Sequence, residues 1–159
     1  MIGITSYGAY IPWHRIERQL FAKAWGGFAI PGERAIASYD EDSVTMAVES
    51  AIDCLSGIDA ATVDGLLFAT TTSPYKEKLC SATMAPALHL RRDIRTGDIT
   101  GSLRSGTTAL AFAYDAIKAG KANSMLVTAS DTRMAPPSGI TEQSLGDSAA
   151  ALLLGQKMS

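Results

Sequence analysis

Apolar, strand-like segments alternate with helix-like segments along most of the chain, and this alternation restricts the possible folds more than any other feature. The clearest helical segment follows the acidic run 40–42 and repeats apolar residues at helical spacing from Val44 to Leu55. Its acidic start suits the positive end of a helix dipole, and Gly57 is suited to end it. Strands that alternate with helices form βαβ units. The sequence therefore predicts an α/β chain with a largely parallel sheet.

The other elements follow from the same kinds of pattern. Strands are expected where apolar residues form short runs, and helices where apolar residues recur every three to four positions. Pro86 falls in the middle of one expected helix and weakens it. The expected strands are 2–11, 63–71, 94–100, 125–130 and 149–154, and the expected helices are 15–25, 81–90 and 107–119, with 28–40 as a surface excursion.

Charge and composition argue against several classes of protein. Fourteen basic and sixteen acidic side chains give a formal charge of −2, so nothing indicates the excess of Lys and Arg that binds nucleic acid. The chain shows neither a signal-peptide pattern nor an apolar stretch of about 20 residues. We therefore expect a cytoplasmic protein with no nucleic-acid or membrane partner.

Cysteine and histidine positions do not suggest a metal site. Cys54 and Cys80 form no CxxC pair and no Cys/His cluster, so neither a disulfide framework nor a zinc site is expected. His14 follows the first strand, and His89 ends a short helix, where its charge suits the helix dipole. The acidic run 40–42 is explained by the start of a helix. We predict no metal.

A loop rich in glycine and serine, residues 101–106, introduces an alanine-rich helix. Alanine at positions 109, 111, 113 and 116 permits close backbone approach, so we expect this helix to be buried on more than one side. The first amides of a helix have no intrahelical acceptor and can bind an anion or oxyanion.

Four motifs resemble the thiolase superfamily, and in particular its hydroxymethylglutaryl-CoA synthase and ketoacyl synthase III branch. They are the opening strand Gly3–Pro12, the helix start Tyr39–Ala47, the loop and helix start Gly101–Leu110, and the GDSAAA motif Gly146–Ala151. The resemblance extends over the whole chain but over only half of such enzymes, which consist of two similar βαβαβ halves. It implies that residues 1–159 form an N-terminal half-domain with a mixed, mostly parallel five-stranded sheet and a buried Ala-rich helix.

Two departures from the family pattern concern catalysis. The family's nucleophilic cysteine lies three residues before the Gly-Thr of the central helix, which corresponds to Leu103 here. Matching Pro74-Tyr75 to the family's HPY motif places Thr71 where hydroxymethylglutaryl-CoA synthases have a glutamate base. Leucine forms no covalent acyl-enzyme, and threonine accepts no proton near neutral pH. The resemblance therefore implies that the acyl-transfer chemistry of the family is lost.

Nearby residues are candidates for the remaining roles. Ser102 and Cys80 are weak alternative nucleophiles, since neither has the sequence context of an activated one. The resemblance places Arg104, Ser105 and Gly106 in a loop that faces a bound thioester, where Arg104 would hold a phosphate or carboxylate. A salt bridge between halves or subunits is the alternative interpretation of Arg104.

Three functions remain open. The first is a catalytically defective thiolase-fold subunit, structural or binding acyl-CoA, in a larger assembly. The second is a cysteine-independent lyase that cleaves a β-hydroxyacyl-CoA by a retro-aldol step, with Tyr75, Tyr114 or Asp131 as possible base. The third is an acyl-CoA acyltransferase of the family type. A coenzyme A thioester is the expected ligand, and the expected partners are another copy, a second thiolase half, or an OB-fold and zinc-ribbon protein. The loop 131–133 is expected near the pocket rim and subunit interface.

Overall fold

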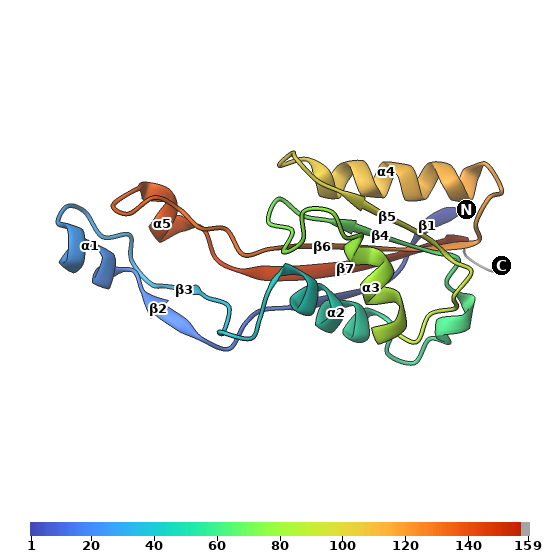
Figure 1. The fold of residues 1–159 in the computed structure, drawn as a ribbon, viewed down its shortest axis with the longest axis horizontal. Coiled ribbons are helices and arrows are strands. Elements are labelled where there is room, and N and C mark those ends of the chain that lie inside the picture. Colours follow the sequence, from blue (N-terminus) through green and yellow to red (C-terminus); the bar gives the residue numbers. More distant parts are fainter. Residues whose placement is uncertain (157–159) are drawn as a thin grey trace.

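A mixed five-stranded sheet forms the centre of the structure (Figure 1). The computed structural model describes residues 1–156. β4 pairs in parallel with β5 and β6, whereas β7 is antiparallel to its neighbours β1 and β6. Four strands therefore share one direction, which confirms the mostly parallel sheet. In the order β1-β7-β6-β4-β5, the strands are β1 (Ile2–Tyr10), β7 (Ser148–Gln156), β6 (Ser124–Asp131), β4 (Gly65–Ala69) and β5 (Arg95–Ile99).

Helices cover the two faces of the sheet unequally (Figure 1). α2 (Ser43–Cys54) and α3 (Cys80–Ala87) lie on one face, and α4 (Ser105–Lys118) lies on the other. Alternate residues of a strand point to opposite faces, so Phe68 packs with the α2 side and its neighbour Ala69 with the α4 side. These three helices begin within one or two residues of their expected starts. Within residues 1–156, no helix combines the length and apolar character needed to cross a membrane.

A smaller unit projects beyond one end of the sheet (Figure 1). It contains β2 (Arg15–Glu17), α1 (Gln19–Trp25), β3 (Glu33–Ala35) and α5 (Ile140–Ser144). The prediction of a helix over 15–25 is wrong for its first residues, because these pair antiparallel with β3. The segment 28–40, expected to be a surface excursion, contains the short strand β3. The two strands have three residues each, too few for a recognisable pattern.

Buried polar side chains hold the segments of this projecting unit together and join it to the start of β7. The Gln143 side chain accepts a hydrogen bond from the Ile30 amide at 2.8 Å and donates one to the Phe28 carbonyl at 3.1 Å. Asp147, in the GDSAAA motif, accepts from the Ala37 amide at 2.8 Å. Segments more than 100 residues apart in the sequence are thereby held at one end of the sheet.

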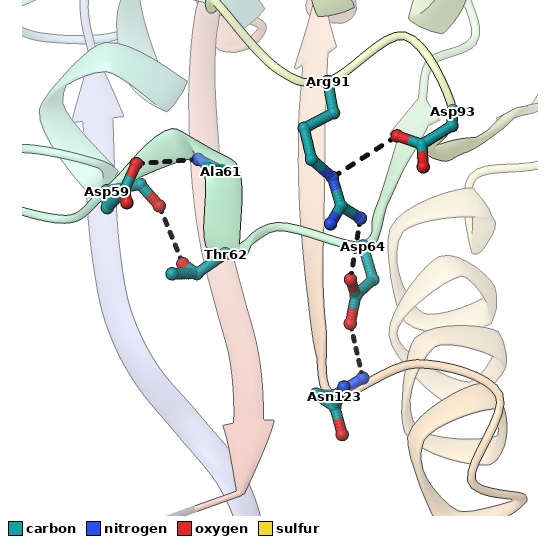
Figure 2. A network of polar contacts seen from close by, with 7 residues as sticks. All are labelled: Asp59, Ala61, Thr62, Asp64, Arg91, Asp93 and Asn123. Carbon is teal, nitrogen blue, oxygen red and sulfur yellow. Dashed lines mark hydrogen bonds and ion pairs between the residues drawn. The ribbon is translucent and has the colours of Figure 1, made fainter.

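A separate polar network joins the loops that precede β4 and β6, at the end of the sheet away from the projecting unit (Figure 2). The Asp64 carboxylate accepts from the Asn123 amide at 2.8 Å and from Arg91 at 2.9 Å, and Arg91 also lies 3.4 Å from Asp93. The Asn123 N–H, together with Arg91, lowers the pKa of Asp64. The stability that this interaction adds is therefore present above the ordinary aspartate pKa and is lost as the pH falls through the lowered value.

The N-terminus of α2 provides a direct test of a capping interaction. Asp42 accepts from the amides of Val44 and Thr45, both at 2.8 Å, and the Thr45 hydroxyl accepts from the Asp42 amide. Replacing Asp42 with alanine is expected to lower the free energy of unfolding by about 1 kcal/mol. Urea denaturation measures this change. Asp59→Ala is a milder control, because Asp59 caps only the three-residue helix Ala60–Thr62. Equal losses in the two variants would contradict the prediction.

Candidate functional site

A pocket of about 270 Å³ lies where the carboxyl ends of β4 and β6 meet the start of α4. Ligands of open α/β sheets commonly bind at the carboxyl ends of strands. The lining side chains are small, apolar or hydroxyl-bearing, with one carboxylate among them. The residues that line this pocket are Ala69, Thr70, Thr71, Ser102, Leu103, Ser105, Gly106, Ala129, Ser130, Asp131, Gly146 and Ser148.

The parallel pairing of β4 with β6 brings Thr71 and Asp131 together. Ala69 and Ala129 are paired across the two strands, and Thr71 and Asp131 each follow two positions later. Asp131 ends β6 and Thr71 lies in the turn after β4, and both residues line the same pocket. The Thr71 hydroxyl donates to Oδ1 of Asp131 at 3.0 Å.

Asp131 is held by a run of three threonines. Its Oδ1 also accepts from the Thr70 hydroxyl at 3.0 Å, the Thr72 hydroxyl at 3.0 Å and the Thr71 amide at 2.6 Å. Hydrogen bonds to an ionised acceptor are stronger than those between neutral groups. The carboxylate and the turn after β4 therefore fix one another, and the site contains a carboxylate next to the position that the resemblance assigns to a glutamate.

The loop before α4 presents Leu103 to the pocket. Leu103 is 77% exposed, and Gly101 has a φ of 79°, a conformation that favours glycine. Ser102 folds the loop back on itself, since its hydroxyl accepts from the Arg104 amide at 3.1 Å and its carbonyl accepts from the Ser105 hydroxyl at 2.6 Å. No lining residue of the pocket bears a thiol.

The structure separates the other candidates from this pocket. Cys80 is fully buried at the start of α3, and burial raises the pKa of its thiol, so it is not placed to act as a nucleophile here. Arg104 is exposed and does not line the pocket, unlike its neighbours Ser105 and Gly106. Tyr75 and Tyr114 lie outside it and contact Lys78 and Lys118, respectively. Of the three possible bases, only Asp131 lines the pocket.

The two histidines lie outside the pocket, on different parts of the chain. His14 is exposed beside β2, and its carbonyl accepts from the Ile36 amide at 3.1 Å. His89 is exposed beyond α3 with a φ of 54°. Over the described range 1–156, no three His, Cys, Asp or Glu side chains group in a way that would hold a metal ion.

Comparison with known proteins shows that this chain is similar in sequence to hydroxymethylglutaryl-CoA synthases. Hydroxymethylglutaryl-CoA synthase of Pyrococcus horikoshii is 30% identical over 161 residues, which cover 99% of this chain and 46% of that protein. The synthase of Caldivirga maquilingensis is 31% identical and is covered to 47%. These homologues confirm the resemblance to the thiolase superfamily. It spans about half the length of these curated relatives, and no family model matches it.

Solved structures of a ketoacyl synthase III and a hydroxymethylglutaryl-CoA synthase share the fold. A ketoacyl synthase III from Thermus thermophilus superposes with a TM-score of 0.86 at 23% identity, covering 97% of this chain and 51% of that one. A hydroxymethylglutaryl-CoA synthase complexed with CoA gives a TM-score of 0.87 at 24% identity, with 98% of this chain and 42% of that chain covered. These likenesses confirm the thiolase-like sheet and helix arrangement.

The helix α4 is buried on one face only. Its fully or nearly buried residues are Ser105, Ala109, Ala113 and Ile117, which recur at helical spacing toward the sheet. On the other side, Phe112 is 56% exposed and Tyr114 is also exposed. The expected burial on more than one side is therefore incomplete within residues 1–156.

Sequence patterns did not reveal the partner of Thr71. Asp131 lies 60 residues away in the sequence and is one of three residues that the sequence offers as a possible base. The signal available in the sequence was its position directly after an apolar strand, at the end where parallel strands of one sheet meet.

Proposed function

We propose that this chain is one half of a thiolase-type assembly, a half-domain over residues 1–159 that binds a coenzyme A thioester without forming a covalent acyl-enzyme. The observation that carries this proposal is Leu103, which lines the pocket from the loop where the resemblance expects a nucleophilic cysteine. A leucine side chain has no atom that can attack a thioester. In such a site, the acyl group would be held and not transferred.

The choice of ligand is supported by a relative and by the shape of the site. The solved hydroxymethylglutaryl-CoA synthase of the same fold is complexed with CoA. The pocket of this chain opens between the sheet and the start of α4, and it combines small apolar walls with hydroxyl groups. A short acyl chain suits such a lining, since it adds little volume and needs few polar partners.

A second α/β half is the proposed partner, supplied by another copy or by another chain. The exposed side of α4 carries Phe112 and Tyr114, and β1 carries Ile4 and Tyr7, the latter 78% exposed. On β1, Ile4 and Tyr7 pair with Leu154 and Leu152, which face the α4 side of the sheet. Large exposed apolar areas mark interaction surfaces. The match to about half of each relative agrees with this arrangement.

The two other functions make different demands on the same pocket. An acyltransferase of the family type needs a nucleophile, which would have to come from outside the lining residues or from a partner. A cysteine-independent lyase needs only a proton acceptor and stabilisation of an enolate. Asp131 is the lining residue that meets the first of these needs.

Covalent acylation separates binding from acyl transfer. After incubation with acetyl-CoA, the wild-type chain is expected to keep its mass in intact-protein mass spectrometry. The matched variant Leu103→Cys places an exposed thiol at the same position and is expected to gain an acetyl group by thioester exchange. A stoichiometric acetyl adduct on the wild-type protein would favour the acyltransferase and overturn the proposal.

A further inference from the structure

The two oxygens of the Asp131 carboxylate have different surroundings. Oδ1 accepts four hydrogen bonds, from the hydroxyls of Thr70, Thr71 and Thr72 and from the Thr71 amide. No group in residues 1–156 donates a hydrogen bond to Oδ2. The fold therefore uses one oxygen to fix the carboxylate and leaves the other for water or a ligand.

The charge of this carboxylate has no cationic partner in the pocket. The lining residues include no lysine, arginine or histidine, and the polar side chains beside Asp131 bear hydroxyls. A ligand that fills the pocket displaces the water around Oδ2. Oδ1 keeps its four hydrogen bonds, but an ionised oxygen without a donor is disfavoured, so a ligand that supplies a donor to Oδ2 binds more favourably than one that does not.

We propose that the pocket selects acyl thioesters whose acyl chain carries a hydroxyl group, and that this hydroxyl donates its hydrogen bond to Oδ2 of Asp131. The inference rests on the proposed binding of a coenzyme A thioester. Leu103, Ala69 and Ala129 supply apolar contacts for the carbon chain, and Asp131 supplies the single acceptor that distinguishes a hydroxyacyl chain from a plain one. A plain acyl chain of equal length would leave Oδ2 without a partner.

Calorimetric titration of the full chain with 3-hydroxybutyryl-CoA and with butyryl-CoA tests this selection. The wild-type protein is expected to bind the hydroxylated thioester at least about tenfold more tightly, as befits a hydrogen bond to a charged group. Asp131→Asn keeps an oxygen for the threonine hydroxyls but removes the charge, and we expect it to reduce the ratio of affinities to within about threefold. Asp115→Asn, an exposed position on α4, removes the same charge outside the pocket and is expected to retain the wild-type ratio.

The possible outcomes are distinguishable. Equal affinity of the wild-type chain for the two thioesters would overturn the hydroxyl selection while leaving the binding of coenzyme A thioesters intact. An unchanged ratio in Asp131→Asn, with thermal unfolding like that of the wild type, would overturn the role of Asp131. Failure of the wild-type chain to bind either thioester would overturn the proposed function together with the inference.

Discussion

Alanine in place of Gly8 is expected to remove about 4 kcal/mol or more of the stability of this chain, enough to unfold a large fraction of it. Gly8 lies on β1 where the strand crosses the last turn of α2. A Cβ atom there would meet the Cys54 amide nitrogen, the Ser50 carbonyl oxygen and, at 2.9 Å, the Cys54 Cα. These are backbone atoms, which cannot rotate away as a side chain can.

Two hydrogen bonds make this contact difficult to relax. The Ser6 hydroxyl donates to the Cys54 carbonyl at 2.7 Å, and the Ala9 amide donates to the Asp53 carboxylate at 3.1 Å. They hold β1 against α2 on both sides of Gly8. Moving the strand outward to admit a methyl group would therefore break them as well.

Other glycines provide matched controls for the Gly8 variant. Gly3 lies on the same strand, and a Cβ atom there meets nothing within 4 Å, so Gly3→Ala is expected to change stability by less than about 1 kcal/mol. Gly65→Ala would contact the flexible end of the Met125 side chain and should be intermediate. Urea denaturation of the three variants measures the order of their free energies of unfolding. A Gly8→Ala protein as stable as Gly3→Ala would show that β1 does not pack against α2 as described.

Local patterns were sufficient to predict the elements that local chemistry determines. The helix α2 has a capping residue at Asp42, an apolar face and a terminating glycine, and all of these lie within one segment of the sequence. β4 is a short apolar run of which most residues are buried. Such features depend on neighbours a few residues away, so the sequence contains the information directly.

Long-range pairing determines what the sequence did not reveal. Residues 15–17 form a strand because residues 33–35 pair with them, and the local apolar spacing alone favoured a helix. The hydrogen bond between Thr71 and Asp131 depends on β6 lying next to β4, although β5 comes between them in the sequence. The order of strands, and not the residue types, decides which side chains meet at the pocket.

The position of Asp98 illustrates a contact of this kind with a large effect on stability. α3 begins after Leu79, which offers no capping side chain. Instead, Asp98 on β5 accepts from the Cys80 amide at 2.6 Å and from the Ser81 amide at 2.9 Å. Both residues are fully buried, so neither amide can turn to water if the carboxylate is lost.

Asp98→Ala is expected to cost about 2–4 kcal/mol, because it leaves two buried amides without an acceptor at the start of a helix. For a chain of this size, a loss of that order lowers the unfolding temperature by about 6–12 °C. Differential scanning calorimetry measures the change, and Asp98→Asn, which retains one carbonyl oxygen, is expected to lose about half as much. If Asp98→Ala lowered the unfolding temperature no more than Asp42→Ala does, another acceptor would have to serve α3, and the role of β5 in starting that helix would be refuted.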